Sequence, residues 1–184
     1  MKTTSVFVYG TLTSPQVVRI LLGRDIPAMI PARLDGHSRH PVINRVYPGM
    51  LKSSEKDHTK RENSFVNGCI LADVTPKEMK LLDWFEADEY ERQIVQVQQL
   101  LDGSVGTRKS DSTIVDSDNK AANSATISPS FTSAAAYIWK PHLADKLSLD
   151  EDWSYENFVE THLEAYLVRT VHPCRAEMER LGMT

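Results

Sequence analysis

The residue best placed for acid–base chemistry is Glu86, because it falls at the end of an amphipathic segment. Residues 75–78, Thr-Pro-Lys-Glu, form a capping-box pattern and predict a helix over residues 76–85. On this helix Glu86 points in nearly the same direction as Met79 and Leu82, so its carboxylate continues the apolar stripe. Burial there would raise the pKa of the carboxyl and suit it to proton transfer near neutral pH.

A second interpretation of the same pattern leaves Glu86 exposed. If the helix ends one turn earlier, the carboxylate leaves the apolar stripe and becomes an ordinary surface group. The neighbouring carboxylates of Asp88, Glu89 and Glu91 fall beyond the expected helix end in either case. They are therefore the natural comparison groups for Glu86.

The turn after the first expected strand is a candidate anion-binding loop. Residues 6–9, Val-Phe-Val-Tyr, form an apolar run typical of a buried strand, and the run stops at Gly10. Main-chain N–H groups of the loop from Tyr9 to Thr13 could then surround a carboxylate or an oxyanion. The loop carries neither a GxGxxG fingerprint nor a P-loop lysine, so an ordinary turn is the alternative.

The histidines and cysteines do not predict a metal site or a nucleophile. His37 and His40 have a spacing compatible with metal binding, but no helix and no acidic partner accompanies them. His162 shares a helical stripe with two aromatic residues, which favours a place in the core or in a pocket wall. Cys69 and Cys174 stand outside any CxxC pair or cationic cluster. We therefore expect neither a metal site nor a disulfide framework.

Short strands fill the first three quarters of the sequence, and a helical region closes it. Residues 47–49, Tyr-Pro-Gly, are expected to form a turn. Strand patterns cover residues 6–9, 66–74, 91–98 and 134–139, and helix patterns cover residues 15–22, 76–85 and 155–167, with Pro173 expected to end or kink the last helix.

Residues 102–132 differ in character from the segments on either side. Gly, Ser, Thr, Asp, Asn and Lys dominate them, and apolar side chains are scattered. Such a segment buries too little apolar area to offset the entropy lost on ordering it. We expect a flexible insertion between two strands of a single domain that spans residues 1–184.

The composition limits the classes of function. The 184 residues are 41% hydrophobic and 25% charged, and 21 Lys+Arg against 25 Asp+Glu give a net charge of −4. That balance argues against a protein that binds nucleic acid. No apolar run reaches the roughly 20 residues that span a bilayer, and residues 1–5 lead into a strand rather than a signal-peptide core. We expect a cytoplasmic monomer or small homo-oligomer without a membrane partner.

Taken together, five segments resemble the gamma-glutamylcyclotransferase-like family. Residues 8–12 resemble its YGS/T-L loop, residues 47–49 its Y-P-G motif, and residues 66–68 its V-x-G strand opening. Residues 82–97 match its L-D-x-x-E-x-x-x-Y-x-R-x-x-V-x-V block. Asp-Trp-Ser at residues 152–154 is most similar to the plant avirulence-induced-gene (AIG2-like) branch and its fungal relatives.

The resemblance implies an α+β fold in which a small mixed β-barrel of short strands is flanked by helices and holds a pocket at one mouth. It also implies an enzyme that cyclises a small γ-glutamyl substrate without a metal or cofactor. In that reaction the α-amine attacks its own γ-carbonyl, and 5-oxoproline and a free amine or amino acid are released.

Carried over residue by residue, the resemblance makes Glu86 the general base and acid. Arg92 would brace the pocket. The substrate-binding residues would be Tyr9, Gly10, Thr11, Leu12 and Thr13, through their backbone, and Tyr90 in the pocket lining.

The sequence departs from the family pattern directly after the candidate catalytic residue. Many members have glycine there, and this chain has Ala87. If the position holds a positive φ, alanine would alter the pocket entrance. The alternative function is therefore a non-catalytic module on the same barrel that binds a small ligand or a partner.

Overall fold

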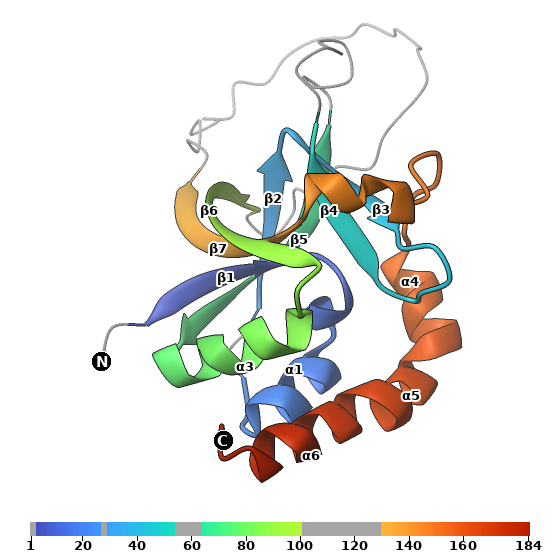
Figure 1. The fold of residues 1–184 in the computed structure, drawn as a ribbon. Helices are drawn as coiled ribbons and strands as arrows, with labels where there is room; N and C mark the ends of the chain where they lie inside the picture. Colours follow the sequence, from blue (N-terminus) through green and yellow to red (C-terminus); the bar gives the residue numbers. More distant parts are fainter. Residues whose placement is uncertain (1–2, 27–28, 54–63, 101–129) are drawn as a thin grey trace, which may run out of the picture.

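Five strands close into a barrel in the computed structural model (Figure 1). In barrel order they are β1 (Thr4–Val8), β5 (Phe65–Val74), β2 (Ile30–Asp35), β6 (Tyr90–Gln99) and β7 (Phe131–Trp139). Neighbouring strands are antiparallel, except that β7 and β1 pair in parallel and close the ring. Helices flank the barrel, so the α+β fold with a small mixed barrel is confirmed.

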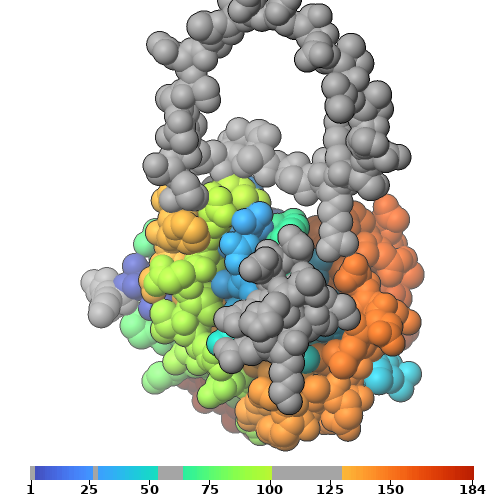
Figure 2. All heavy atoms as spheres, turned by 90° about the horizontal axis from the view of Figure 1, so that it is seen from above, coloured from blue at the N-terminus to red at the C-terminus, as the bar shows by residue number. Residues whose placement is uncertain are grey.

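The structure describes residues 3–26, 29–53, 64–100 and 130–184. Most of the expected insertion lies outside them. The described segments on either side of the gap at residues 101–129 are neighbours, because the N–H of Gln99 donates to the carbonyl of Ser130 at 2.9 Å. The expected end of the insertion, at about residue 132, overlaps the start of β7, because Phe131 and Thr132 pair with Gln98 and Val97 of β6. Figure 2 shows β6 at the surface beside β2, with which it also pairs.

The first strand is buried on both faces, which explains its continuous apolar run. Phe7 packs with Ile70 and Ala136 in one cluster, whereas Val6 and Val8 pack in a second cluster that includes side chains of the helices. Neighbouring strands also approach closely. A Cβ on Gly68 would stand 2.2 Å from the carbonyl oxygen of Val8, so the V-x-G glycine is required by space.

Helix α3 (Pro76–Glu86) carries the candidate catalytic carboxylate, and its start is fixed by the predicted capping box. The amide of Glu78 donates to the Thr75 hydroxyl at 3.3 Å, and the Glu78 carboxylate accepts from the Thr75 amide at 2.8 Å. Arg24 pairs with the same carboxylate. Leu82 is fully buried one turn before Glu86, so the prediction of an apolar stripe that leads to Glu86 is confirmed.

The C-terminal helical region runs from Tyr155 to Arg180 and packs on α1 (Pro15–Leu22) (Figure 1). The sequence predicts that Pro173 ends or kinks the last helix. The helix does not end there, so the first of these two expectations is wrong. The turn before the proline adopts a π-helical pattern, and Pro173 is the second residue of α6, so the helical region continues past it. Its segments are α4 (Tyr155–Asn157), a π turn (Phe158–His162), α5 (Leu163–Tyr166), a π turn (Leu167–Val171) and α6 (His172–Arg180).

Two further strands, β3 (His37–Pro41) and β4 (Pro48–Lys52), form a separate antiparallel pair. The predicted turn at residues 47–49 is therefore wrong, because Pro48 and Gly49 begin β4. Proline is tolerated at a strand end, where it need not donate. Glycine is required next to it, since a Cβ on Gly49 would lie 2.9 Å from the ring of Trp139.

Candidate active site

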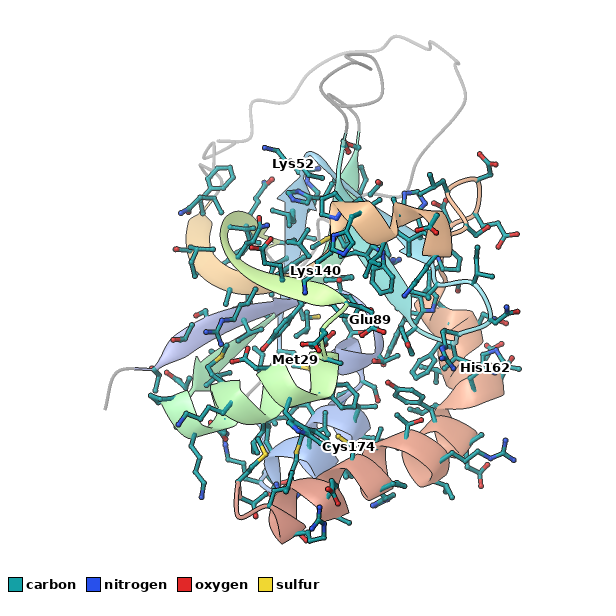
Figure 3. The ribbon with its side chains drawn as sticks, in the orientation of Figure 1. Met29, Lys52, Glu89, Lys140, His162 and Cys174 are labelled. Atoms are coloured by element: carbon teal, nitrogen blue, oxygen red, sulfur yellow. The ribbon has the colours of Figure 1, made fainter. Side chains whose placement is uncertain are left out.

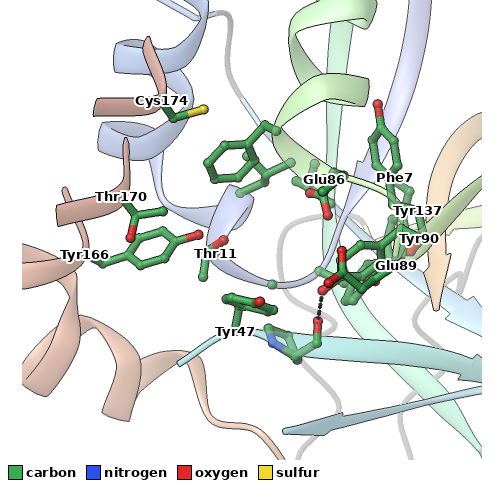
Figure 4. Close-up of a pocket in the computed structure, with 17 residues that line it drawn as sticks. Phe7, Thr11, Tyr47, Glu86, Glu89, Tyr90, Tyr137, Tyr166, Thr170 and Cys174 are labelled. Carbon is green, nitrogen blue, oxygen red and sulfur yellow. Dashed lines mark hydrogen bonds between the residues drawn. The ribbon is translucent and has the colours of Figure 1, made fainter. Parts of the chain in front are cut away.

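A cavity of about 200 Å³ lies where the loop after β1, the end of α3 and the C-terminal helical region meet (Figure 4). Figure 3 shows two of its contributors on different elements, Glu89 after α3 and Cys174 on α6. Its walls are formed by Phe7, Val8, Tyr9, Gly10, Thr11, Leu12, Tyr47, Pro48, Phe85, Glu86, Ala87, Glu89, Tyr90, Tyr137, Tyr166, Thr170 and Cys174.

Glu86 points into the cavity from the end of α3, between Tyr166 on one side and Tyr90 on the other (Figure 4). Burial raises the pKa of its carboxyl to about 8. None of the described residues in the wall is a lysine, arginine or histidine, so no neighbouring cation offsets this effect. The alternative interpretation of the sequence, in which Glu86 is an ordinary surface carboxylate, does not fit this position.

The loop from Tyr9 to Leu12 lines the cavity as expected, whereas Thr13 is not among the lining residues. Thr13 instead supports the loop, because its hydroxyl donates to the carbonyl of Gly10 at 2.5 Å. In the part of the chain that the structure describes, the amides of Gly10, Thr11 and Leu12 donate no hydrogen bond to a protein acceptor. They remain available to a ligand.

Gly10 is needed because the space beside it is occupied. A Cβ would stand 2.9 Å from both Cγ and Cδ of Pro48, the first residue of β4. The close approach of these two segments closes one side of the cavity.

Tyrosine side chains supply much of the remaining wall. Tyr90, expected from sequence to line the pocket, donates to the carbonyl of Pro48 at 2.8 Å and meets the ring of Trp139 edge-on. Tyr9 donates to the carbonyl of Tyr137 at 2.6 Å. Burial raises the pKa of each of these tyrosines, so all of them stay neutral around Glu86.

Arg92 braces this wall from outside the cavity. Its guanidinium lies 2.7 and 2.6 Å from the two carboxylate oxygens of Asp83, and Asp83 accepts the hydroxyl hydrogen of Tyr137 at 2.9 Å. Tyr137 lines the cavity. Asp83 of the L-D motif thereby links Arg92 of the Y-x-R motif to Tyr137 of β7.

Several wall residues were missed from sequence. Tyr166 was visible only as part of a helical stripe, and the same stripe made His162 a candidate for the pocket wall. The structure places Tyr166 in the wall beside Thr11, while His162 is not among the lining residues. Tyr137 and Cys174 carried no distinguishing signal, and Tyr47 was noted only as part of the Y-P-G motif. Burial raises the pKa of the Cys174 thiol to about 11, which agrees with the expectation that it is no nucleophile.

Ala87 adopts φ 58° and ψ −164°, a conformation that is essentially restricted to glycine. This residue directly follows Glu86 and lines the cavity. The positive φ considered from sequence is therefore present, and alanine holds it with strain. The methyl group stands at the cavity wall, where a glycine would leave more room.

We expect Ala87→Gly to stabilise the protein. Relief of strain of about 1–3 kcal/mol exceeds the roughly 0.5–1 kcal/mol entropic cost of glycine. Thermal unfolding should shift upward by about 2–4 °C. Asn44→Gly is the control, since Asn44 also has a positive φ of 60° but asparagine tolerates it. A lower melting temperature for Ala87→Gly would contradict the assignment of strain.

Two classes of feature are absent from the described ranges. No group of three or more His, Cys, Asp or Glu side chains is arranged to hold a metal ion there. No helix within the same ranges has the length and apolarity needed to cross a membrane.

The sequence of residues 6–155 matches the model of a family described as gamma-glutamyl cyclotransferase, AIG2-like. The chain belongs to this family. AIG2-like protein D of Arabidopsis thaliana is 31% identical over 166 residues, which cover 90% of this chain and 86% of that protein. AIG2-like protein C of the same plant is 43% identical over 91 residues, 50% of this chain and 48% of that protein.

The solved structure of an Arabidopsis thaliana protein has the same fold as this AIG2-like chain. That solution structure superposes with a TM-score of 0.56 at 22% identity and covers 99% of this chain and 86% of the other. The family's expected barrel, with short strands and flanking helices, is therefore the fold observed here.

Proposed function

We propose that the protein is a cofactor-free γ-glutamylcyclotransferase that acts on a γ-glutamyl amine or peptide and releases 5-oxoproline. One observation carries the proposal: a desolvated carboxyl, Glu86, shares a small cavity with the free amides of Gly10, Thr11 and Leu12. A proton acceptor and a set of anion-binding donors are the two elements that such a cyclisation requires. Membership of the AIG2-like family supports the same reaction class.

The reaction follows from these two elements. The Glu86 carboxylate takes a proton from the substrate's α-ammonium, and the free amine attacks the γ-carbonyl carbon. The new C–N bond closes a five-membered ring, and the negative charge that develops on the carbonyl oxygen is bound by loop amides. Protonated Glu86 then returns the proton to the leaving nitrogen, and the old C–N bond breaks. The regenerated carboxylate takes the second proton from the ring nitrogen and passes it to the released amine, so 5-oxoproline and the amine in its ammonium form leave.

A pKa of about 8 suits both halves of this cycle. The carboxylate is basic enough to deprotonate an ammonium group, and the carboxyl is acidic enough to protonate a departing nitrogen near neutral pH. The tyrosines around Glu86 stay neutral and do not compete with it for the proton. Tyr9 and Tyr90 thus contribute shape and a low-dielectric environment.

The cavity volume limits the part of the substrate that is enclosed. About 200 Å³ is below the roughly 300–1,000 Å³ of pockets for drug-sized ligands. It suits a γ-glutamyl group, and the leaving group then extends toward the opening. We therefore propose that small γ-glutamyl compounds are the substrate class.

The test is a coupled assay for 5-oxoproline with a panel of γ-glutamyl amines and γ-glutamyl peptides. We expect product from at least one compound and none from the corresponding α-glutamyl compounds, whose geometry prevents ring closure. Calorimetric binding of panel members without product from any of them would favour the alternative, a ligand-binding module that has lost turnover. The strained Ala87 beside Glu86 is the feature of this chain that favours that alternative.

A further inference from the structure

We propose that Arg39 is a positioning residue that fixes the orientation of the Gly10 amide at the cavity, and that Trp153 holds Arg39 in place. The inference rests on the proposed function, because it assigns a task to the loop amides. Arg39 lies in β3, and its Nη1 donates to the carbonyl of Tyr9 at 2.7 Å. Neither Arg39 nor Trp153 is part of the cavity wall.

The geometry of a peptide unit turns this hydrogen bond into control of the next amide. A trans peptide is planar, and its C=O and N–H groups point in opposite directions. The carbonyl of Tyr9 and the amide of Gly10 belong to one such unit. A donor that holds the Tyr9 carbonyl on one side therefore holds the Gly10 N–H on the other side, where Gly10 borders the cavity.

The next two peptide units are held in the same way, but by local partners. The carbonyl of Gly10 accepts from the Thr13 amide at 2.9 Å, and the carbonyl of Thr11 accepts from the Ser14 amide at 3.1 Å. These bonds set the Thr11 and Leu12 amides relative to the loop itself. Of the three hydrogen bonds, the one from Arg39 alone joins the loop to a distant element, 30 residues away in sequence.

Trp153 restrains the arginine that makes this connection. Its ring centroid lies 5.0 Å from the guanidinium carbon of Arg39, within the range of a cation–π contact. The indole N–H donates to the carbonyl of Val46 at 2.9 Å, and the side chain is 7% exposed. The Asp-Trp-Ser segment, which suggested the AIG2-like branch from sequence, thereby acts on the cavity through Arg39.

The charge of Arg39 adds to the geometric effect. A charged donor on a carbonyl polarises the peptide unit and strengthens its N–H as a donor. Burial lowers the pKa of the guanidinium, while Glu156 and Asp152 favour its charged form. A neutral side chain of similar size would lose both the donor and the polarisation.

The experiment compares Arg39→Met, Arg39→Lys and Arg33→Met. Arg33 is a matched control, because its guanidinium also stacks on an aromatic ring, Phe65, at 5.0 Å, yet it pairs with Asp35 rather than with the loop. We expect Arg39→Met to lower kcat/KM for 5-oxoproline release by about 10²-fold, the typical effect of a misplaced reacting group. Arg39→Lys should retain at least a tenth of wild-type kcat/KM, and Arg33→Met should match wild type.

The Gly10 amide provides a readout that does not depend on turnover. In ¹⁵N-labelled, ligand-free protein, its NMR signal should move in Arg39→Met, return most of the way in Arg39→Lys, and stay in place in Arg33→Met. An unmoved Gly10 signal, or an equal shift in Arg33→Met, would overturn the role of Arg39 even if the wild type is active. A wild type without any turnover but with the expected Gly10 shifts would overturn the proposed reaction and leave the positioning role supported.

Discussion

Glu86→Gln should lower kcat for 5-oxoproline release by about 10²–10⁴-fold, the usual range for a lost general base. The amide keeps the shape of the side chain in a cavity of about 200 Å³, so substrate binding should change little. Steady-state kinetics on the best compound of the panel, together with calorimetric binding to the variant, separate the two effects. The measured loss should therefore appear in kcat and leave the dissociation constant near that of wild type.

The pH dependence of the wild type should identify the same group. Its ionised form is the base, and burial raises the pKa of Glu86 to about 8. Below that pH, kcat/KM should rise about tenfold per pH unit and then level off above about 8. A free glutamic acid, with a pKa of about 4.3, would give a flat profile across the same interval.

Two neighbouring carboxylates serve as controls. Asp88 is exposed and does not line the cavity, so Asp88→Asn should retain wild-type activity. Glu89 lines the cavity on the loop after α3, and Glu89→Gln should have an effect of only a few-fold because the proposed proton transfers do not use it. Full activity of Glu86→Gln together with loss in Glu89→Gln would show that the wrong carboxylate has been assigned.

Stability provides an independent test of the burial of Glu86. The folded-state pKa of about 8 lies above the roughly 4.3 of an unfolded chain, so the folded state binds this proton more tightly. The stabilisation of the folded state by protonated Glu86 is therefore fully present below about pH 4.3 and is lost as the pH rises to about 8. Glu86→Gln should melt above wild type at pH 9, and the difference should shrink as the pH falls toward 4.5.

The position of Glu86 could be predicted because short-range interactions determine it. The capping box fixes the start of α3, and a period of 3.6 residues then places Glu86 on the stripe of Met79 and Leu82. Each of these features lies within twelve residues of the others in the sequence. The loop after β1 was equally local, since it is an apolar strand that ends at a glycine.

The contacts that the sequence did not reveal join distant segments. Pro48 and Gly49 resemble a turn when read alone, but pairing with β3 and the ring of Trp139 make them a strand. The hydrogen bond from Arg39 to the Tyr9 carbonyl joins residues 30 apart and follows no periodic pattern. Contacts between distant segments thus determine how the loop after β1 is supported. Local sequence patterns, in contrast, were enough to predict Glu86 and the loop itself.

Gly10→Val should lower kcat/KM by about 10³-fold while the protein still unfolds cooperatively. Even a Cβ at this position would stand 2.9 Å from two ring atoms of Pro48, and the rigid proline belongs to β4. The loop must therefore move, and the amides of Gly10, Thr11 and Leu12 move with it. Removal of one oxyanion donor typically costs 10²–10³-fold in kcat, so displacement of several donors should cost at least that much.

A graded series separates displaced amides from general damage to the fold. Gly10→Ala introduces only the Cβ and should fall between wild type and Gly10→Val. Thr11→Ala removes a hydroxyl beside Tyr166 but keeps every amide in place, so its loss should be less than about tenfold. Thermal unfolding of all three variants should remain cooperative. If Gly10→Val and Thr11→Ala both caused equally mild losses, the backbone amides of this loop would not be the groups that bind the developing charge.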